Sequence, residues 1–391
     1  MKQKYSERAL AVAPSTTLEI TARAAELKNS GADLISFGAG EPDFDTPAAI
    51  KQAAIEAIEG GFTKYTATAG IPALRQALAD KLKRDNNLEY TANQIIVTNG
   101  GKQAIYNALQ AILNPGEEVI LFAPYWLSYP EMIKMAGGQP VVLPTCLEEK
   151  YLPDLAKLKR LITPKTKAIL FNSPCNPTGA VYPEEVLRGL AELAVRHDLW
   201  VLSDEIYEKL VYNGKKHISI ASLGEDIFRR TIVLNGFSKA YAMTGWRFGY
   251  AAGEKEVIAI MTRLQSHQTS NVNSITQKAA LAAFSSTEFP AMYEAFDKRR
   301  QFMVNYLRSI PQVHFAEPDG AFYVLLDVRE FLAKRGITAV EMAKDLLEKQ
   351  FVAVVPADDF GISGHIRLSY PIDTAKIEVG LSRLKKYLLT V

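Results

Sequence analysis

Short apolar runs alternate with longer helical patterns along most of this chain. Strand-like runs rich in Val, Ile, Leu and small apolar residues occur at Gln94–Thr98, Glu118–Phe122, Ala168–Asn172, Trp200–Ser203, Thr231–Leu234 and Arg247–Ala251. Apolar residues recur at helical spacing in Lys102–Leu113, Tyr129–Ala136 and Glu184–His197. Continuous apolar strands that alternate with helices are typical of a parallel sheet covered on both faces. The chain is therefore predicted to be an α/β protein built around such a sheet.

The pattern changes after about residue 290, which predicts a second, smaller α/β domain. Its predicted elements are the helices Met292–Ser309, Val340–Lys349 and Thr374–Leu389 and the strands Gly320–Asp327, Phe351–Val355 and His365–Ser369. The N-terminal segment, with a predicted helix at Thr16–Asn29, is expected to join them. No low-complexity linker is visible, so we expect a continuous helix to cross the boundary. The prediction is a large domain of residues 46–290 and a small domain of residues 1–45 and 291–391.

Composition narrows the class of protein. The net charge of +2 favours neither nucleic acid nor an anionic membrane as a partner. No window approaches 18 continuous apolar residues, and the N-terminus has no apolar signal region. The two cysteines, Cys146 and Cys175, are too few for a disulfide framework, and no CxxC pair suggests zinc. We therefore expect a cytoplasmic protein with reduced thiols and without a bound metal.

Polar residues follow the predicted strands at the point where each ends. The turn Asn99-Gly100-Gly101-Lys102 leads from a strand into a helix. Glycines in such a turn expose backbone N–H groups, and a helix N-terminus favours an anion such as phosphate. A tight turn without a ligand explains the glycines equally well.

Two further strand ends carry side chains with hydrogen-bonding or charged groups. Asn176 lies between Pro174 and Pro177, which hold the backbone extended around it, although an Asn-Pro turn is also common. Asp204 ends an apolar strand, where a carboxylate is costly unless it meets a cation or a donor. It could equally cap the next helix.

Lys239 follows the strand Thr231–Leu234 within Gly236-Phe237-Ser238-Lys239, and Arg247 comes eight residues later. Taken alone, the lysine suits an exposed loop and the arginine suits a surface ion pair. In open α/β sheets, however, ligands bind outside the carboxyl ends of the strands, where all these groups converge. Lysine forms Schiff bases with carbonyl cofactors. These groups match what pyridoxal phosphate needs. A lysine would bind its aldehyde, a carboxylate its ring nitrogen, and a glycine turn its phosphate.

Eight segments in order along the chain resemble the class I, fold-type I aminotransferases, and most of all the bacterial aspartate aminotransferases of the prokaryotic subgroup. They are FGAGEPDFDTP, KYTATAGIPALR, IVTNGGKQA, APYWLSYPEM, NSPCNPTGA, SDEIYE, GFSKAYAMTGWRFGY and HIRLSY. The resemblance implies a three-layer α/β/α sandwich with a mostly parallel seven-stranded sheet, a smaller α/β domain, and pyridoxal phosphate as the cofactor. It also implies a ping-pong transfer of the amino group of L-aspartate to 2-oxoglutarate.

The resemblance also implies a role for individual residues. Lys239 would form the Schiff base and carry the proton, and Asp204 would pair with the pyridine nitrogen. Tyr207 and Asn176 would bind the ring oxygen, and Trp126 would stack on the ring. The residues implied to hold the phosphate are Gly101, Lys102, Ser238, Arg247 and, from the neighbouring subunit of a homodimer, Tyr65. Arg367 would clamp the substrate α-carboxylate, Gly40 would let the backbone approach the substrate, and Trp126 and Asn176 also fall among the substrate-binding residues.

Substrate choice depends on fewer residues. In the resembled subgroup, the lysine of the Gly-Gly-Lys turn and hydroxyls near the N-terminus bind the distal carboxylate, and Lys102, Ser15 and Thr16 occupy the matching positions. The N-terminal helix would then act as a closing lid. Prephenate, an aromatic or another amino acid remains an alternative substrate, and β-elimination an alternative reaction on the same scaffold. A ligand-sensing regulator on this fold would need an attached DNA-binding domain, which we do not expect because the aminotransferase-like pattern begins by about residue 15.

Overall fold

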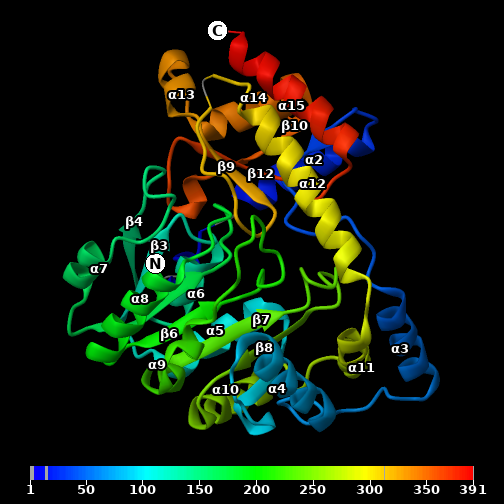
Figure 1. Cartoon of the computed structure of the whole chain (residues 1–391), viewed down its shortest axis with the longest axis vertical. Helices are drawn as coiled ribbons and strands as arrows, with labels where there is room; N and C mark the ends of the chain where they lie inside the picture. Colours follow the sequence, from blue (N-terminus) through cyan, green and yellow to red (C-terminus); the bar gives the residue numbers. More distant parts are fainter. Residues whose placement is uncertain (1–3, 14–15, 312, 391) are drawn as a thin grey trace.

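The computed structural model describes residues 4–13, 16–311 and 313–390 of the chain. A seven-stranded sheet forms the centre of its larger part (Figure 1). In spatial order the strands are β2 (Ile95–Asn99), β8 (Phe248–Ala252), β7 (Thr231–Gly236), β6 (Trp200–Asp204), β5 (Thr166–Asn172), β3 (Glu118–Ala123) and β4 (Gln139–Pro144). The pairs from β7 to β4 are parallel, whereas β8 is antiparallel to both of its neighbours. The predicted mostly parallel sheet is confirmed.

Two strands differ from the prediction for local reasons. The sequence analysis missed β4, an edge strand whose residues are exposed or half-exposed except for one and whose run contains two prolines. Proline is tolerated at a sheet edge but weakens the strand signal. β8 begins at Phe248 because Arg247 has a φ of 55°, in the left-handed region that a strand cannot contain.

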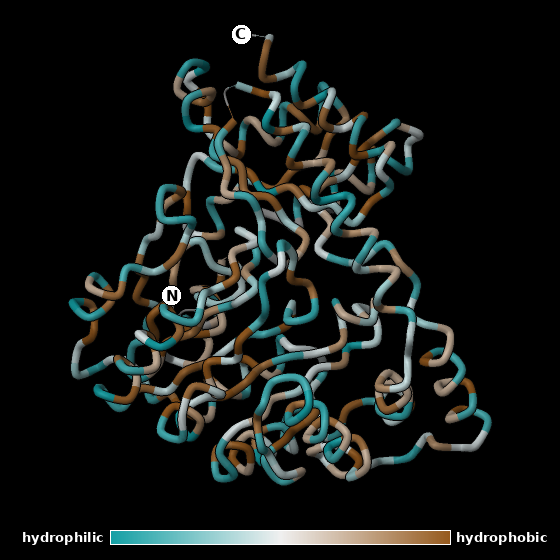
Figure 2. The backbone as a smooth tube through the Cα atoms, in the orientation of Figure 1, coloured by the Kyte–Doolittle hydropathy of each residue, from teal (hydrophilic) through white to brown (hydrophobic). Residues whose placement is uncertain are grey.

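Helices cover both faces of the sheet, so the three-layer arrangement follows from alternating side chains. Ile96 packs with one group of helices, and its neighbours Ile95 and Val97 pack with another. The first face is covered by α5 (Gly100–Ile112), α6 (Ser128–Met135) and α10 (Lys255–Gln268). The opposite face is covered by α3 (Ala48–Glu59), α4 (Pro72–Asn86), α7 (Leu155–Leu161), α8 (Glu184–Arg196), α9 (Glu225–Arg230) and α11 (Ser274–Ala282). Figure 2 shows hydrophobic residues along the central strands, whereas the outer helices alternate between hydrophobic and hydrophilic residues.

The smaller part is built on two short sheets. One sheet pairs β9 (Tyr323–Asp327), β12 (His365–Ser369) and β11 (Val355–Pro356), and the other pairs β1 (Ile35–Ser36) with β10 (Val352–Ala353). Its helices are α2 (Thr16–Asn29), α13 (Arg329–Arg335), α14 (Ala339–Gln350) and α15 (Thr374–Leu389). The predicted strand Phe351–Val355 is split and begins later, because Phe351 ends α14 in a left-handed conformation.

The predicted division into two domains has structural support but stays a prediction. The parallel pair β1–β10 joins residue 35 to residue 352, which places the N-terminal segment with the C-terminal part. Figure 1 shows α12 (Phe289–Leu307) running from the larger part to the smaller one, as expected for a helix that crosses the boundary. The remaining short elements are α1 (Glu7–Leu10), η1 (Ala92–Gln94), η2 (Ile220–Leu223), η3 (Ala283–Ser285) and η4 (Asp358–Phe360). Within the described ranges, no helix is both long enough and apolar enough to cross a membrane.

Candidate active site

A cavity of about 460 Å³ lies between the edge of the large sheet and the smaller part of the molecule. Eleven predicted site residues line it: Gly40, Gly101, Lys102, Trp126, Asn176, Asp204, Tyr207, Ser238, Lys239, Arg247 and Arg367. They come together because β5, β6 and β7 are parallel and end at the same edge. Arg247 reaches this edge differently, since β8 is antiparallel and Arg247 lies just before its start, where Gly249 pairs with Gly236.

The turn Asn99-Gly100-Gly101-Lys102, predicted to bind phosphate and called here the phosphate-type turn, is packed against Arg247. Gly100 has a φ of +78°, and a Cβ there would lie 2.3 Å from Nη2 of Arg247. Only glycine therefore lets the guanidinium approach the start of α5. The N-cap side chain, Asn99, makes no capping bond to the first turn of α5, and Gly101 and Lys102 of this turn line the cavity beside Arg247. The turn thus combines helix N-terminal amides with a cation, as an oxyanion ligand requires.

Asp204 is buried below the cavity and is held by two donors. The Tyr129 hydroxyl donates to Oδ2 at 2.6 Å, and the Ile206 N–H donates to Oδ1 at 3.2 Å. Burial raises the pKa of Asp204 to about 6, partly offset by these hydrogen bonds. A buried carboxylate with a raised pKa is well placed to pair with a cationic ligand group. The alternative of a helix cap is not what the structure shows, since a turn and no helix follows Asp204.

Lys239 projects into the same cavity. Its Nζ donates a hydrogen bond to the Gly40 carbonyl oxygen. Its side chain keeps some contact with solvent through the cavity, but the surrounding protein desolvates the amine and lowers its pKa to about 8. The Glu41 carboxylate opposes this shift. The Lys239 amine is therefore deprotonated far more readily than an ordinary lysine, as a nucleophile or base requires.

Hydroxyl and amide groups line the wall between Asp204 and the smaller part. The hydroxyls of Tyr207 and Tyr323 hydrogen-bond to each other at 2.8 Å. The Asn176 amide oxygen accepts from Arg367, so its NH₂ end is the group left for a ligand. Asn172 links the two strand ends, because its NH₂ donates to the Asp204 carbonyl and its oxygen accepts from the Asn176 N–H, both at 2.8 Å.

Arg367 of β12 brings a guanidinium from the smaller part into the cavity. It is 4% exposed and lies over the Tyr323 ring, 4.4 Å from its centroid. It donates to Asn176 Oδ1 and to the Gly38 carbonyl oxygen, each at 3.0 Å. Within the part of the chain that the structure describes, Arg367 has no carboxylate partner, and its buried Nε has no hydrogen-bond partner. A buried guanidinium without a carboxylate partner is suited to a bidentate carboxylate ligand.

Lys102 and Trp126 form the side of the cavity next to the phosphate-type turn. Nζ of Lys102 lies 4.9 Å from the Trp126 ring centroid, and the indole packs edge-on against Tyr129. Burial lowers the pKa of Lys102, and the nearby Arg247 lowers it further. An anion beside Lys102 would relieve both effects.

Three residues of the site were missed by the sequence analysis: Tyr129, Tyr323 and Asn172. Tyr129 follows Trp126 by three residues at the start of a helix, and this spacing was the available signal. Asn172 ends the same strand that leads to Asn176, so its position was also visible. Tyr323 comes from β9 in the smaller part, and the sequence carries no signal for its contact with Tyr207.

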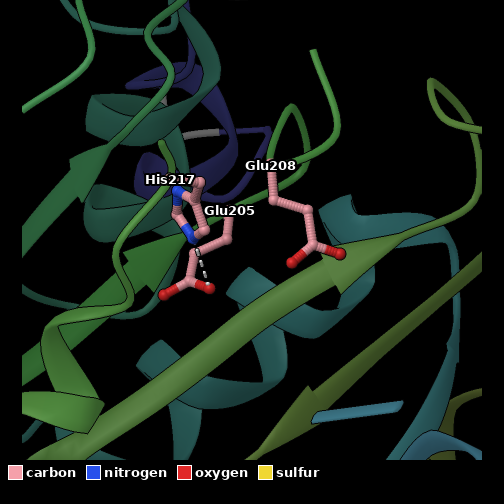
Figure 3. A group of neighbouring side chains, drawn as sticks. All are labelled: Glu205, Glu208 and His217. Carbon is pink, nitrogen blue, oxygen red and sulfur yellow. Dashed lines mark hydrogen bonds and ion pairs between the residues drawn. The ribbon is translucent and has the colours of Figure 1, made fainter. Parts of the chain in front are cut away.

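A buried polar network lies behind the site. Asp204 and Tyr207 line the cavity, whereas Glu205 and Glu208 do not. The carboxylates of Glu205 and Glu208 lie near His217 instead (Figure 3). Glu205 accepts from Ser203, Ser219 and His217, at 3.0, 2.6 and 3.0 Å. Glu208 pairs with the Lys81 ammonium and accepts from Asn86 at 2.8 Å. Lys81 thus already supplies a cation to Glu208, and the bonds to Glu205 anchor the strand end that carries Asp204.

Tyr65 does not line the cavity, and the structure does not test Ser15 or the Thr16 side chain. Tyr65 is 89% exposed on the loop between α3 and α4. Ser15 lies outside the described residues, as does the side chain of Thr16, whose backbone begins α2. The nearby Ala13 N–H donates to Glu131 of α6 at 3.0 Å, which brings the N-terminal segment to the helix that follows Trp126. A second, more open cavity of about 610 Å³ is also lined by Arg247, together with Phe44, Asn99 and Asn273.

The cavity fits pyridoxal phosphate and an amino-acid substrate by the charge of its lining. Its lining has four cationic side chains, Lys102, Lys239, Arg247 and Arg367, and two carboxylates, Glu41 and Asp204. This excess of positive charge suits a phosphate and a carboxylate ligand together. The glycine turn accommodates Arg247 at close range, and the unpartnered Nε of Arg367 offers a second anion site.

The chain is similar to known proteins over almost its whole length. The family model for aminotransferase class I and II matches residues 32–384. An aspartate aminotransferase of Bacillus sp. (strain YM-2) is 47% identical over 390 residues, covering 99% of this chain and 100% of the relative. A probable aspartate/prephenate aminotransferase of Thermus aquaticus is 48% identical over 388 residues, covering 98% of this chain and 99% of the relative.

A solved structure agrees with the fold as well. The aspartate aminotransferase from Thermus thermophilus with maleate superposes with a TM-score of 0.93 at 46% identity. The match covers 98% of this chain and 99% of that chain.

Proposed function

The chain belongs to the class I and II aminotransferases, and we propose that it transfers the amino group of L-aspartate to 2-oxoglutarate. It is a pyridoxal phosphate enzyme with amino-acid and oxo-acid substrates. One observation carries the proposal: Lys239, Asp204 and Arg367 line one cavity. Asp204 ends β6 and Lys239 follows β7 of the large sheet, whereas Arg367 lies within β12 of a separate sheet. These are an amine, a carboxylate and a carboxylate-binding guanidinium, which transamination of an amino acid requires together.

Each part of the cofactor has residues that would hold it. Gly101, Lys102, Ser238 and Arg247 would bind the phosphate, and Asp204 would pair with the ring nitrogen. Tyr207 and Asn176 would donate to the ring oxygen, and Trp126 would stack on the ring. When bound, the cofactor supplies an aldehyde that accepts the amino group and a protonated ring that withdraws electrons. Asp204 favours that protonated ring because a carboxylate beside it stabilises the positive charge.

Lys239 is proposed as the group that moves the proton. Its amine would take the proton from Cα of the substrate as a general base and return it to the C4′ carbon of the cofactor. The lowered pKa of about 8 leaves a usable fraction of free amine at neutral pH. Tyr207 and Gly40 lie next to this amine and would fix its direction: the Tyr207 ring centroid lies 6.0 Å from Nζ, and the Gly40 carbonyl accepts from it.

Arg367 and Lys102 are proposed to bind the two ends of a dicarboxylic substrate. Arg367 would take the α-carboxylate with the help of Asn176, while Gly40 allows the backbone to approach. Lys102 would contact the distal carboxylate, with Ser15 and Thr16 from the N-terminal lid. The Thermus thermophilus relative was solved with maleate, a four-carbon dicarboxylate, which supports a site of this kind. Relatives named aspartate/prephenate aminotransferases make prephenate, or another amino donor or acceptor, the second candidate.

A homodimer with shared active sites is also proposed. Tyr65 is almost fully exposed, although tyrosine has a large apolar ring, and the second cavity opens beside Arg247. The partner's Tyr65 would enter this cavity and reach the cofactor phosphate. The cytoplasmic location expected from the sequence stays a prediction, with Cys146 and Cys175 as free thiols in the structure.

A half-reaction screen tests the proposed substrate. The purified enzyme with bound cofactor is mixed with single amino acids, and conversion of the cofactor to its aminated form is followed by absorbance. Aspartate and glutamate should convert it fastest, and faster conversion by a neutral amino acid would contradict the proposal.

The variant Lys102→Ala separates side-chain recognition from phosphate binding. We expect kcat/KM for aspartate to fall by about 10- to 100-fold more than kcat/KM for alanine or phenylalanine, because only aspartate has a distal carboxylate to lose its partner. An equal loss for the three substrates would show that Lys102 does not read the side chain.

A further inference from the structure

The loop that carries Tyr65 is anchored at its backbone, although the Tyr65 side chain is free in the structure. This loop, residues 60–71, joins α3 to α4. Tyr65 is 89% exposed, and no described residue hydrogen-bonds to its hydroxyl. Loops that only connect helices on a surface need no such anchoring.

Gln277 of α11 is the main anchor. It is fully buried at 0% exposure. Its Oε1 accepts from the Ile71 N–H at 2.8 Å, and its Nε2 donates to Thr66 Oγ1 at 3.0 Å and to the Val272 carbonyl at 2.8 Å. The Gln277 side chain therefore bonds to the loop at two places, Thr66 and Ile71, and to Val272 just before α11. Burying a primary amide is costly unless such partners are present, and a satisfied network of this kind rigidifies what it joins.

A second buried amide completes the anchoring. Gln265 of α10, also 0% exposed, donates to the Thr68 carbonyl at 3.1 Å and to the Val97 carbonyl of β2 at 2.9 Å. Its oxygen accepts from Asn107 at 3.0 Å. The loop is also pressed onto β2 at Gly70, which has a φ of +105° and where a Cβ would lie 2.0 Å from Val97 Cγ2. The backbone on the C-terminal side of Tyr65 is thus fixed to the sheet.

We propose that Gln277 is a positioning residue that acts in trans: together with Gln265 it preorganises the Tyr65 loop for the active site of the partner subunit. This inference rests on the proposed shared-site dimer. The physical reason is the cost of ordering a loop on association, which a loop already fixed by its own subunit does not incur again. In its own subunit Gln277 does not line the cavity that holds Lys239.

Mixed dimers distinguish a role in trans from a role within one subunit. One chain carries Lys239→Ala with an intact loop, and the other carries Gln277→Met with an intact Lys239. The differently tagged dimers are freed of cofactor and titrated with pyridoxal phosphate. The pH-dependent visible absorption band reports only the site that has Lys239, and this site receives the intact loop of the other chain.

We expect the Gln277→Met homodimer to bind the cofactor about tenfold more weakly, which corresponds to roughly one hydrogen bond to a charged group. The mixed dimer should bind it with wild-type affinity. Weak binding in the mixed dimer as well would overturn the proposal, because the defect would then lie within the subunit. If Gln277→Met does not fold, Thr66→Val removes only the hydroxyl that accepts from Gln277, and it should give the same pattern with a smaller loss.

Two further variants make the outcome specific. Gln301→Met is the matched control, since Gln301 is an exposed glutamine on α12 that donates to Asp297 at 2.9 Å, and it should bind cofactor like the wild type.

Tyr65→Phe in the same mixed dimers tests the shared site itself. If Tyr65→Phe shows no recovery in mixed dimers, the shared-site proposal fails. If Tyr65→Phe recovers and Gln277→Met does not, only the positioning role of Gln277 fails.

Discussion

The hydroxyl of Tyr129 donates a 2.6 Å hydrogen bond to Oδ2 of Asp204, and both residues are buried beneath the cavity. Tyr129 is on the first turn of α6, three residues after Trp126. One helix start therefore supplies both the ring proposed to stack on the cofactor and the donor that fixes the carboxylate proposed to charge it. This geometry makes the protonation of Asp204 depend on a residue that does not line the cavity.

Tyr129→Phe should move the acid limb of the kcat/KM profile to higher pH. In the wild type, the hydrogen bond from Tyr129 favours the ionised form of Asp204. Its loss in the variant therefore raises the pKa of Asp204 further. We expect kcat to fall by about tenfold, as for the loss of one hydrogen bond to a charged group. Tyr293→Phe, which loses a 2.8 Å bond to the Val211 carbonyl away from the cavity, is the control and should leave the profile in place. An unchanged acid limb in Tyr129→Phe would contradict the role of the bond.

Asp204→Asn should stabilise the cofactor-free protein while it reduces activity. Burial raises the pKa of Asp204 from 3.8 to about 6, so the folded state binds this proton more tightly than the unfolded state. The wild type therefore loses stability as the pH rises from about 4 to about 6, and the loss persists above pH 6. The variant should gain about 1 to 3 kcal/mol in free energy of unfolding at pH 8 and much less at pH 4. Urea unfolding at both pH values measures this, and an equal gain at both would contradict a buried charge.

The Lys239 amine should react with small aldehydes at unusually low pH in the cofactor-free protein. Burial lowers its pKa to about 8, so half of the amine is unprotonated there. Reductive labelling followed by peptide mapping should show half-maximal modification of Lys239 near pH 8, with the other lysine peptides as internal references. Lys239→Ala should also abolish the pH-dependent visible absorption of the bound cofactor. A surviving band in that variant would rule out Lys239 as the cofactor lysine.

Arg367→Lys should weaken all amino-acid substrates to a similar degree. A lysine keeps the charge but cannot make the bidentate contact that the planar guanidinium makes with an α-carboxylate. We expect kcat/KM to fall by about 100-fold for aspartate, alanine and phenylalanine alike. Arg308→Lys, at an exposed ion pair with Glu317, serves as the control. A loss confined to aspartate would place Arg367 at the side-chain end of the substrate instead.

The sequence predicted the central sheet and the edge of that sheet at which the site forms. Apolar runs of strand length alternate with helical periodicity, and this pattern needs no tertiary information. Because parallel strands end at one edge, the positions of Asn176, Asp204 and Lys239 after three such runs predicted that they would meet. The same logic failed for β4, whose exposed edge position and prolines remove the apolar signal.

Other relationships exist only in the folded molecule. The antiparallel direction of β8 brings Arg247 to the ligand edge from the start of a strand, and no local pattern specifies that direction. Tyr323 and Arg367 arrive from a separate sheet, so their contacts with Tyr207 and Asn176 depend on how the two parts pack. The sequence by itself determined which chemical groups the protein has and which strand ends carry them. Tertiary structure decided their pKa values and their partners, because burial and the close approach of distant segments set both.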